Sequence, residues 1–430
     1  MGTERVDVVI TQAAELVTAR VGDGCARGAA LDDLEVIADG ALAMRDGTIV
    51  AVGTTAEIAD RYVADRTIDA DGRCVSPGLV DCHTHAVYAG SRHDEWERKV
   101  TGSATTNLGG GIRTTLASTR AATEEDLRAQ ARDDLDRMLA YGTTTAEIKS
   151  GYGQDVDTEL RQLRVIAELD HQVDVVGTYL ALHVLPDEYG DDPEAYLDLA
   201  VDLLPEARRY AGYVDVAVDP IAFTAEQCER LTAAARAQGL GIRVHADQTA
   251  DADGTAFAVR HGAASVDHLD EINTAGLAAL AASDTVGVLF PGVTLHMLET
   301  TPEASPEAQP PRSNRPVWAR QLVKSGAALA LSTDFNPGTS PTRSMQLVMQ
   351  LAARLYRLSY AEIWHMSTIN PAVSLDRGGV TGSLEPGKRA DVVIWDVPEH
   401  GMVIHQFGTN LADTVIAAGE VVVEGGQPIR

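Results

Sequence analysis

The chain has 430 residues, of which 45% are hydrophobic and 23% charged, so it is long enough for one large folded domain with a smaller module beside it. Its formal net charge of −28 argues against nucleic acid and against an anionic membrane as partners, because both would be repelled. Four dispersed cysteines without a CxxC pair, and no apolar run near the roughly 18 residues of a membrane span, lead us to expect a protein of the cytoplasm.

Short β-like runs separated by turns fill both ends of the chain, with no helical period beside them. The Asp46-Gly47 step between two such runs carries the sequence signal of a tight β-hairpin. The shared pattern suggests one small β-sandwich domain formed by residues 1–77 and 376–430. Its expected strands lie within 6–10, 40–53, 67–72, 390–396, 414–419 and 420–424.

Between these ends, β-like runs alternate with amphipathic helical patterns, which is the signature of parallel βα units. Eight such strands predict an α/β fold with a (β/α)8 barrel over residues 78–375. The 251 positions that separate His83 from Asp334 match the typical barrel size of about 250 residues. The expected strands are 78–83, 143–148, 176–183, 214–218, 242–247, 264–268, 286–290 and 327–333. The clearest helices are 124–139, 192–204, 225–237 and 344–358.

Polar residues stand where several of these strands stop, and active sites of such barrels lie at the carboxyl ends of strands. The first strand ends in His83-Thr-His85, and alternation along a strand points both imidazoles to one side. Later strands end in similar fashion with His183, His245, His268 and, after the last strand, Asp334. A single histidine at such a place is more often a core or loop residue than a ligand, but five together with an aspartate favour a metal site. Three nitrogens and one carboxylate suit zinc or ferrous iron, either of which lowers the pKa of water to roughly 7.

Several segments resemble the amidohydrolase superfamily and, within it, the imidazolonepropionases of histidine degradation. The general segments are PGLVDCHTH at 77–85, HADQ at 245–248, VDH at 266–268 and GSLEPGK at 382–388. EIKSGYG at 147–153 and DFNPGTSPT at 334–342 are more specific to imidazolonepropionases. The likeness covers about residues 37 to 395 and includes Tyr88-Ala-Gly-Ser-Arg92.

The resemblance implies a single divalent metal ion, zinc or iron, held by His83, His85, His245 and Asp334. It implies that Asp334 also takes a proton from water and that His268 orients the water or the carbonyl oxygen. The substrate would be a small cyclic molecule with a carboxylate arm. Dimers are common in the family, so a homodimer is one expectation for the assembly. Positions implied to bind the substrate are Arg92 and Tyr152 at the carboxylate arm, with His183, Asn336, Gly338 and Thr339.

Three departures from the family pattern fall around the same pocket. Gln248 stands where many imidazolonepropionases carry a glutamate, and an amide can form hydrogen bonds in catalysis but cannot shuttle a proton. The segment 102–109 is short and lacks a tyrosine of the family. The fourth barrel strand ends in Val216-Ala-Val-Asp219-Pro220, where the family tends to show a Cys-Glu pair. These changes suggest that the reaction type survives while the substrate differs.

The leading hypothesis is hydrolysis of 4-imidazolone-5-propanoate to N-formimidoyl-L-glutamate. The alternative prompted by Gln248 is hydrolysis of a related azole, hydantoin or thiohydantoin ring, including replacement of an exocyclic group by water. A non-catalytic scaffold is a third class, and retention of the four implied ligands counts against it.

Overall fold

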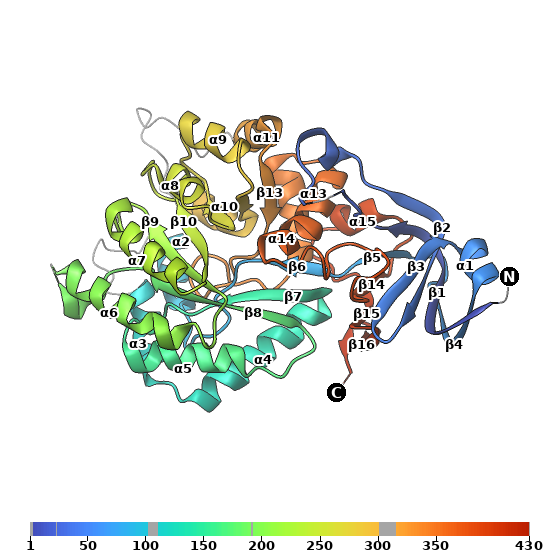
Figure 1. Cartoon of the computed structure of the whole chain (residues 1–430), viewed down its shortest axis with the longest axis horizontal. Coiled ribbons are helices and arrows are strands. Elements are labelled where there is room, and N and C mark those ends of the chain that lie inside the picture. Colours follow the sequence, from blue (N-terminus) through green and yellow to red (C-terminus); the bar gives the residue numbers. More distant parts are fainter. Residues whose placement is uncertain (1–2, 23, 102–110, 191, 301–314, 430) are drawn as a thin grey trace.

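The computed structural model describes residues 3–22, 24–101, 111–190, 192–300 and 315–429. Two sheets organise the chain: an eight-stranded parallel sheet ringed by helices, and a nine-stranded mixed sheet made from both termini. They lie side by side along the long axis of the molecule (Figure 1). The predicted fold class, a barrel with a small β-domain from the two ends, is confirmed.

The barrel strands pair in chain order, and every pairing between neighbours is parallel. The ring closes where Thr84 forms a β-bridge with Phe335 and the backbone N–H of His85 donates to the Phe335 carbonyl at 2.8 Å. Each strand lies within two residues of its predicted bounds. The strands are β6 Leu79–Asp81, β7 Thr143–Lys149, β8 Asp174–Leu182, β9 Tyr213–Val218, β10 Gly241–Ala246, β11 Ser265–His268, β12 Val286–Leu289 and β13 Ala328–Leu331.

Helices cover the outside of the barrel, and polar caps set where many of them begin. Thr123 and Asp126 form a capping box at the start of α4, as Thr224 and Gln227 do at α7. The helix expected over 344–358 is shorter, because α12 passes into a π-helical turn at Ala352–Tyr356. The helices are α2 His93–Val100, α3 Ile112–Ala121, α4 Glu124–Ala140, α5 Val156–Ala167, α6 Pro193–Ala207, α7 Ala225–Ala237, α8 Gly254–Arg260, α9 Thr274–Ala281, α10 Pro291–Thr300, α11 Arg315–Ser325, α12 Met345–Leu351, α13 Tyr360–Ser367 and α14 Ile369–Ser374.

The terminal sheet joins the two ends of the chain where β5 pairs antiparallel with β14. The predicted hairpin turn is present, since Asp46 and Gly47 take positive φ angles of 49° and 69°, as a type I′ turn requires. The expectation of no helix here is wrong, because α1 at Thr55–Arg61 follows β3 and α15 at His400–His405 follows β14. Helix α1 buries Ile58 alone, so its sequence carries no apolar period to detect. The strands are β1 Glu4–Val17, β2 Val36–Arg45, β3 Thr48–Thr54, β4 Tyr62–Asp69, β5 Cys74–Pro77, β14 Val392–Trp395, β15 Ala412–Ala417, β16 Glu420–Glu424 and β17 Gln427–Pro428, with the short helix α15 at His400–His405.

The chain passes between the two sheets at two places. Pro77 ends the last terminal strand before the barrel, and Leu79 begins β6. The last barrel helix ends at Ser374. We propose these crossings as the domain boundaries, with the barrel over 78–375.

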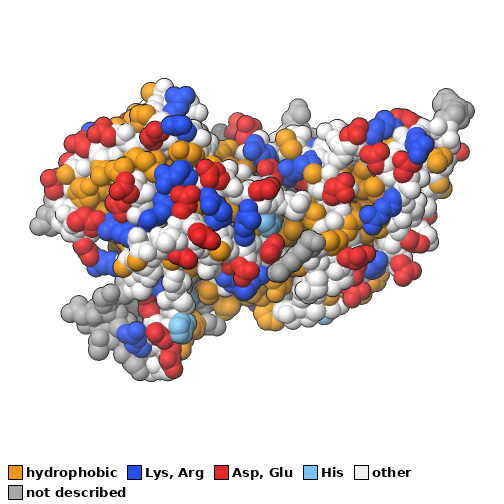
Figure 2. Space-filling view, turned by 90° about the horizontal axis from the view of Figure 1, so that it is seen from below, with side chains coloured by type: hydrophobic (Ala, Val, Ile, Leu, Met, Phe, Trp, Pro, Cys, Tyr) orange, Lys and Arg blue, Asp and Glu red, His pale blue; other side chains and the backbone are white. Residues whose placement is uncertain are grey.

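The surface mixes charges of both signs, as Figure 2 shows for one face. Within the described residues, no helix is both long and apolar enough to cross a membrane.

Candidate active site

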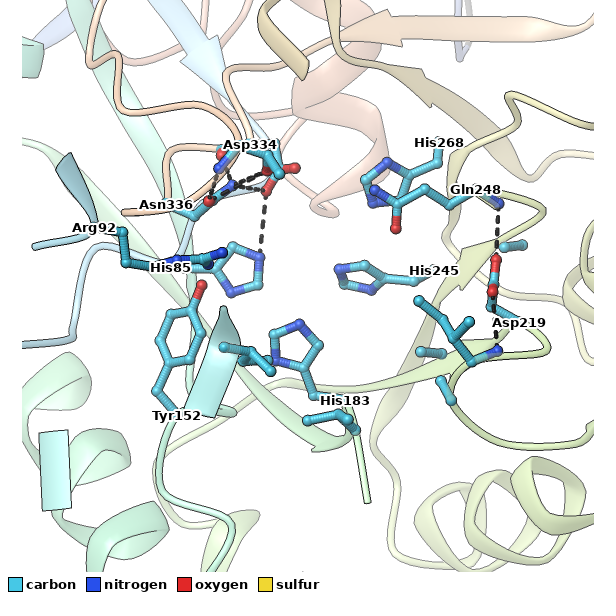
Figure 3. A pocket seen from close by; sticks show the side chains of 17 residues that line it. His85, Arg92, Tyr152, His183, Asp219, His245, Gln248, His268, Asp334 and Asn336 are labelled. Carbon is cyan, nitrogen blue, oxygen red and sulfur yellow. Dashed lines mark hydrogen bonds and ion pairs between the residues drawn. The ribbon is translucent and has the colours of Figure 1, made fainter. Parts of the chain in front are cut away.

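The ends of four barrel strands bring the predicted polar residues to one place. His83 and His85 follow β6, His245 lies in β10, His268 ends β11, and Asp334 follows β13. Residues separated by up to 251 positions in the chain therefore share one mouth of the barrel. Figure 3 shows the side chains of His85, His245, His268 and Asp334 around a common centre. The β-strand ends position these groups, as expected for a barrel enzyme.

The four implied metal ligands fall in two groups that share His83: one holds His85 and Asp334, and the other holds His245 with His268. Asp334 Oδ1 is 3.4 Å from His85 Nε2 and 3.6 Å from His83 Nε2. The rings of His83 and His245 have centroids 4.6 Å apart. These groups form the kind of buried histidine and carboxylate cluster that can hold a metal ion.

Carboxylates behind two of the histidines fix the direction of their rings. Asp267 Oδ2 lies 2.7 Å from His83 Nδ1, and Asp215 Oδ1 lies 3.0 Å from His245 Nδ1. Because a carboxylate accepts, Nδ1 of each ring carries the proton and Nε2 keeps its lone pair for the site. Nε2 of His83 is buried with no hydrogen-bond partner among the described residues.

Burial keeps two of the implied ligands, His83 and His85, in the neutral form that binds a metal, whereas at His245 burial is outweighed by Asp215, which raises the pKa of that ring. Desolvation, with the nearby His245 and Lys149, lowers the pKa of His85 to about 3. The pKa of His83 is lowered well below its usual value, again chiefly by burial. Neutral imidazoles with buried ring nitrogens lacking partners fit a divalent ion better than a purely structural hydrogen-bond network.

The loop after β13 is held by side chains at both of its ends. Asp81 accepts hydrogen bonds from Ser332 Oγ and from Thr333 N and Oγ1, the last two at 3.0 and 2.6 Å. Asn336 Nδ2 donates to the backbone oxygen and to Oδ1 of Asp334 at 2.6 and 3.1 Å. The backbone of Asp334 itself takes a positive φ of 48°. The loop therefore fixes the aspartate in one orientation.

A cavity of about 270 Å³ lies over this cluster. Its walls include most of the predicted substrate-binding residues, namely Arg92, Tyr152, His183, Asn336 and Thr339, together with Gln248 and His268. Gly338 lines a neighbouring cavity instead. The structure thus gathers the predicted residues around one pocket and places Gly338 just outside it.

Arg92 is held in place before any substrate arrives. Its Nε and Nη2 donate to the two carboxylate oxygens of Glu95 at 3.0 and 2.8 Å. Burial opposes ionisation of Glu95, but Arg92 and Lys99 outweigh it and lower the pKa of that carboxyl to about 2. A Cβ on Gly338 would lie 2.1 Å from Arg92 Nη1, so this glycine leaves the room that the guanidinium occupies.

Aromatic rings form the side of the cavity opposite Asp334. His183 stacks on His85 with centroids 5.5 Å apart, and its Nδ1 lies 3.2 Å from the Gly151 carbonyl oxygen. The ring of Tyr152 lies 5.5 Å from that of His85, with its hydroxyl turned toward the cavity (Figure 3). A flat ring can pack between such groups.

Gln248 lines the cavity, and hydrogen bonds to Asp219 hold the backbone that carries it. Asp219, another of the departures from the family pattern, accepts from the backbone N–H groups of Gln248 and Thr249 at 3.2 and 2.9 Å. Both Gln248 and Asp219 line the cavity, so these two departures from the family pattern change the lining of the same cavity. The shortened segment 102–109 lies outside the described residues.

Sequence reasoning missed the supporting residues Asp215, Asp267, Lys149 and Glu95. A signal existed for Asp215, which is a charged residue inside an otherwise apolar strand. Such residues are almost never buried without a partner. Glu95 had no comparable signal, because α2 is rich in charged residues.

Comparison with known proteins agrees with this geometry. The profile of the amidohydrolase family matches residues 74–423, and that of the bacterial imidazolonepropionase-like composite domain matches residues 40–62. An imidazolonepropionase from Chloroflexus aggregans is 41% identical, with 98% of this chain and 99% of the relative covered. One from Geobacillus kaustophilus is 39% identical, with 92% and 93% covered.

Solved structures share the fold at lower identity. An adenosine deaminase from Xanthomonas campestris superposes with a TM-score of 0.72 at 20% identity, covering 100% of this chain and 95% of that one. A triazine hydrolase variant gives 0.71 at 18% identity, covering 98% and 96%. Profile, relatives and fold agree over nearly the whole length, and the chain therefore belongs to the imidazolonepropionases of the amidohydrolase family.

Proposed function

We propose that this chain hydrolyses 4-imidazolone-5-propanoate to N-formimidoyl-L-glutamate, a step of histidine degradation. One water is added, and the bond between the ring carbonyl carbon and its neighbouring ring nitrogen breaks. The carbonyl carbon becomes a carboxylate, and the released nitrogen takes up a proton. The observation that carries the proposal is a single cavity with a buried histidine and aspartate cluster at its base and Arg92 in its wall.

We propose that His83, His85, His245 and Asp334 hold one divalent ion, zinc or ferrous iron. The support is a donor set of three nitrogens and one carboxylate, with the His83 and His245 rings oriented by aspartates. When bound, the ion supplies Lewis-acid chemistry, polarising the ring carbonyl and lowering the pKa of a water molecule toward 7.

Asp334 is the proposed proton carrier between the attacking water and the ring nitrogen that leaves. Burial raises the pKa of this carboxyl to about 7 while no ion is bound, and its Oδ1 lies among the implied ligands, 3.4 Å from His85 Nε2, where it can take a proton from an adjacent water. His268 would orient the water or carbonyl oxygen through a neutral ring, since burial lowers its pKa well below the usual value. Gln248 contributes hydrogen bonds to the ring and moves no proton.

Arg92 and Tyr152 would bind the carboxylate arm of the substrate. An arginine binds a carboxylate through parallel hydrogen bonds, and Arg92 Nη1 has no hydrogen bond within the described part of the chain. His183 and Thr339 would contact the ring. Asn336 would act through Asp334 and Thr339, both of which it holds, and Gly338 through the space it leaves for Arg92.

The proposal is tested by identifying products after incubation with freshly generated imidazolonepropionate and with a panel of hydantoins and thiohydantoins. We expect formimidoyl-glutamate from the first substrate, and none from Asp334→Asn loaded with the same metal. Turnover confined to the other rings would reject this substrate and support the alternative that Gln248 favours. The homodimer and the cytoplasmic location stay predictions.

A further inference from the structure

Five charged side chains lie in the barrel interior behind the proposed metal centre. They are Glu147 and Lys149 on β7, Asp215 on β9, Arg243 on β10 and Asp267 on β11. Each has a relative accessibility of 0%. Charged groups tolerate such burial only when they are paired, so the contacts within this cluster are constrained.

Lys149 lies at the centre of the cluster. Its Nζ is 2.7 Å from Asp215 Oδ2, 2.8 Å from Glu147 Oε1 and 3.9 Å from Asp267 Oδ2. The other cation, Arg243, donates to the backbone oxygens of Cys82 and Ser374 at 2.8 and 3.0 Å, and its Nε lies 3.7 Å from Glu147 Oε1. The charge of Arg243 also favours ionisation of Asp267, but Lys149 is the cation that forms ion pairs with both aspartates.

These two aspartates are the groups that orient the His245 and His83 rings. Asp215 uses one oxygen for His245 Nδ1 and the other for Lys149, so the carboxylate is held from both sides. Asp267 presents the same oxygen to His83 Nδ1 and to Lys149. One ammonium group thus connects the supports of two imidazoles whose strands are far apart in the sequence.

We infer that Lys149 is a positioning residue, which fixes Asp215 and Asp267 so that Nε2 of His245 and of His83 points into the metal site. The inference rests on the proposed metal-dependent function. It concerns binding of the ion alone, so it can be tested without a substrate.

Charge and geometry must be separated in the test. The cluster holds three carboxylates and two cations, so Lys149→Met alone adds an excess negative charge that would attract a dication. That attraction would oppose the effect of losing the contacts to the aspartates. The double variant Glu147→Gln/Lys149→Met removes one charge of each sign and leaves the net charge unchanged, so its metal affinity reports the geometry.

The experiment measures Zn²⁺ affinity of metal-free protein by competition with a chromophoric chelator. We expect Glu147→Gln/Lys149→Met to bind Zn²⁺ about ten-fold or more weakly, the usual loss when the groups supporting metal ligands are changed. Glu147→Gln, which keeps the contact of Lys149 with Asp215, should stay within a few-fold of the wild type. The visible spectrum of bound Co²⁺, which depends on ligand geometry, should change in the double variant only.

Arg320→Met is the control for stability. Arg320 pairs with Glu362, a buried carboxylate on the outer helix α13, so this variant also strips a cation from a buried acid. It should melt at a lower temperature yet bind Zn²⁺ as the wild type does. If Lys149→Met folds, its Zn²⁺ affinity is also measured. If it does not fold, the Zn²⁺ affinity of Glu147→Gln/Lys149→Met decides the test.

Unchanged or tighter Zn²⁺ binding by the double variant would overturn the role of Lys149. Equal weakening in Arg320→Met would overturn it too, because the loss would then follow from stability. A wild-type protein that binds neither Zn²⁺ nor Fe²⁺ would reject the metal centre itself, and the inference with it.

Discussion

At the scale of single residues, substitution of Arg92 is expected to affect substrate binding without affecting the chemical step. The Arg92 guanidinium is held by Glu95 and lines the cavity, but within the described residues it forms no hydrogen bond or ion pair with the proposed metal ligands. We predict that Arg92→Ala raises KM for imidazolonepropionate by about 10- to 100-fold, the scale of a lost charged hydrogen bond, with kcat and metal content nearly unchanged. Steady-state kinetics and metal analysis check this.

The matched control is Arg113→Ala. Arg113 is an exposed arginine that forms its ion pair with Asp187 and does not line the cavity. Its KM should stay at the wild-type value. Equal KM values for Arg92→Ala and the wild type would show that the carboxylate arm binds elsewhere.

Substitution of Gln248 tests whether the pocket binds imidazolonepropionate, the usual substrate of the family. If it does, Gln248→Glu restores a group that many relatives carry, and we expect activity on imidazolonepropionate to be kept or raised. If the amide instead pairs with a different ring, the new carboxylate leaves a contact unmade, which costs about 1–3 kcal/mol or roughly ten- to a hundred-fold in rate. Rates of both proteins on imidazolonepropionate and on the hydantoin panel distinguish the cases. A fall on every substrate would contradict the first expectation.

At the scale of elements, the loop that follows β13 positions both the proton carrier and the arginine. Gly338→Ala places a methyl group where Arg92 Nη1 lies, so the guanidinium must move while its charge is kept. We predict a rise in KM smaller than that of Arg92→Ala, with kcat nearly unchanged. In the Arg92→Ala background the same change should have little further effect, because the two residues act as one unit.

Gly379→Ala is the control for that loop variant, since a Cβ there meets no atom within 4 Å. It should match the wild type in KM. Full additivity of Gly338→Ala and Arg92→Ala would mean that Gly338 acts through another contact.

The elements most predictable from sequence are those that their own residues determine. The barrel strands follow from apolar runs of strand length, and Asp46-Gly47 alone determines a hairpin turn. The sequence did not predict helix α1, because a seven-residue helix with one buried side chain shows no periodic spacing of apolar residues. Its capping box, Thr54 with Glu57, was the available signal.

The proposed metal ligands could be predicted from the sequence, but the residues that orient these ligands could not. A histidine that ends an apolar strand can be located without a structure, as His245 shows. The partner of a buried charge cannot, because it depends on how strands meet in space: Lys149 on β7 reaches past β8 to Asp215 on β9. The same limit applies to Glu95, whose role depends on the direction in which the Arg92 side chain points.

At the scale of the whole molecule, contacts within the barrel and between the two sheets make the chain one unit. The barrel closes where Thr84 meets Phe335. The terminal sheet packs on the barrel through Trp395, whose ring lies 5.9 Å from that of Trp364 on α13, and through Arg389, whose Nη2 donates to Thr145 Oγ1 on β7 at 3.0 Å. We therefore expect a single cooperative unfolding transition.

Metal removal tests this unity, because the proposed ligands come from the first, fifth and last barrel strands and an ion would tie them together. An ion that binds only the folded state, present at about 1,000 times its Kd, stabilises by about 4 kcal/mol. With about 2.1 cal/mol/K of unfolding entropy per residue, that amount corresponds to a fall in Tm of about 4 °C when the metal is stripped. Differential scanning calorimetry of the chelated and the Zn²⁺-restored protein measures the shift. His245→Ala, which lacks one proposed ligand, should show a much smaller response to the chelator. A wild-type Tm that stays constant while metal analysis confirms its loss would contradict the bridging role of the ion.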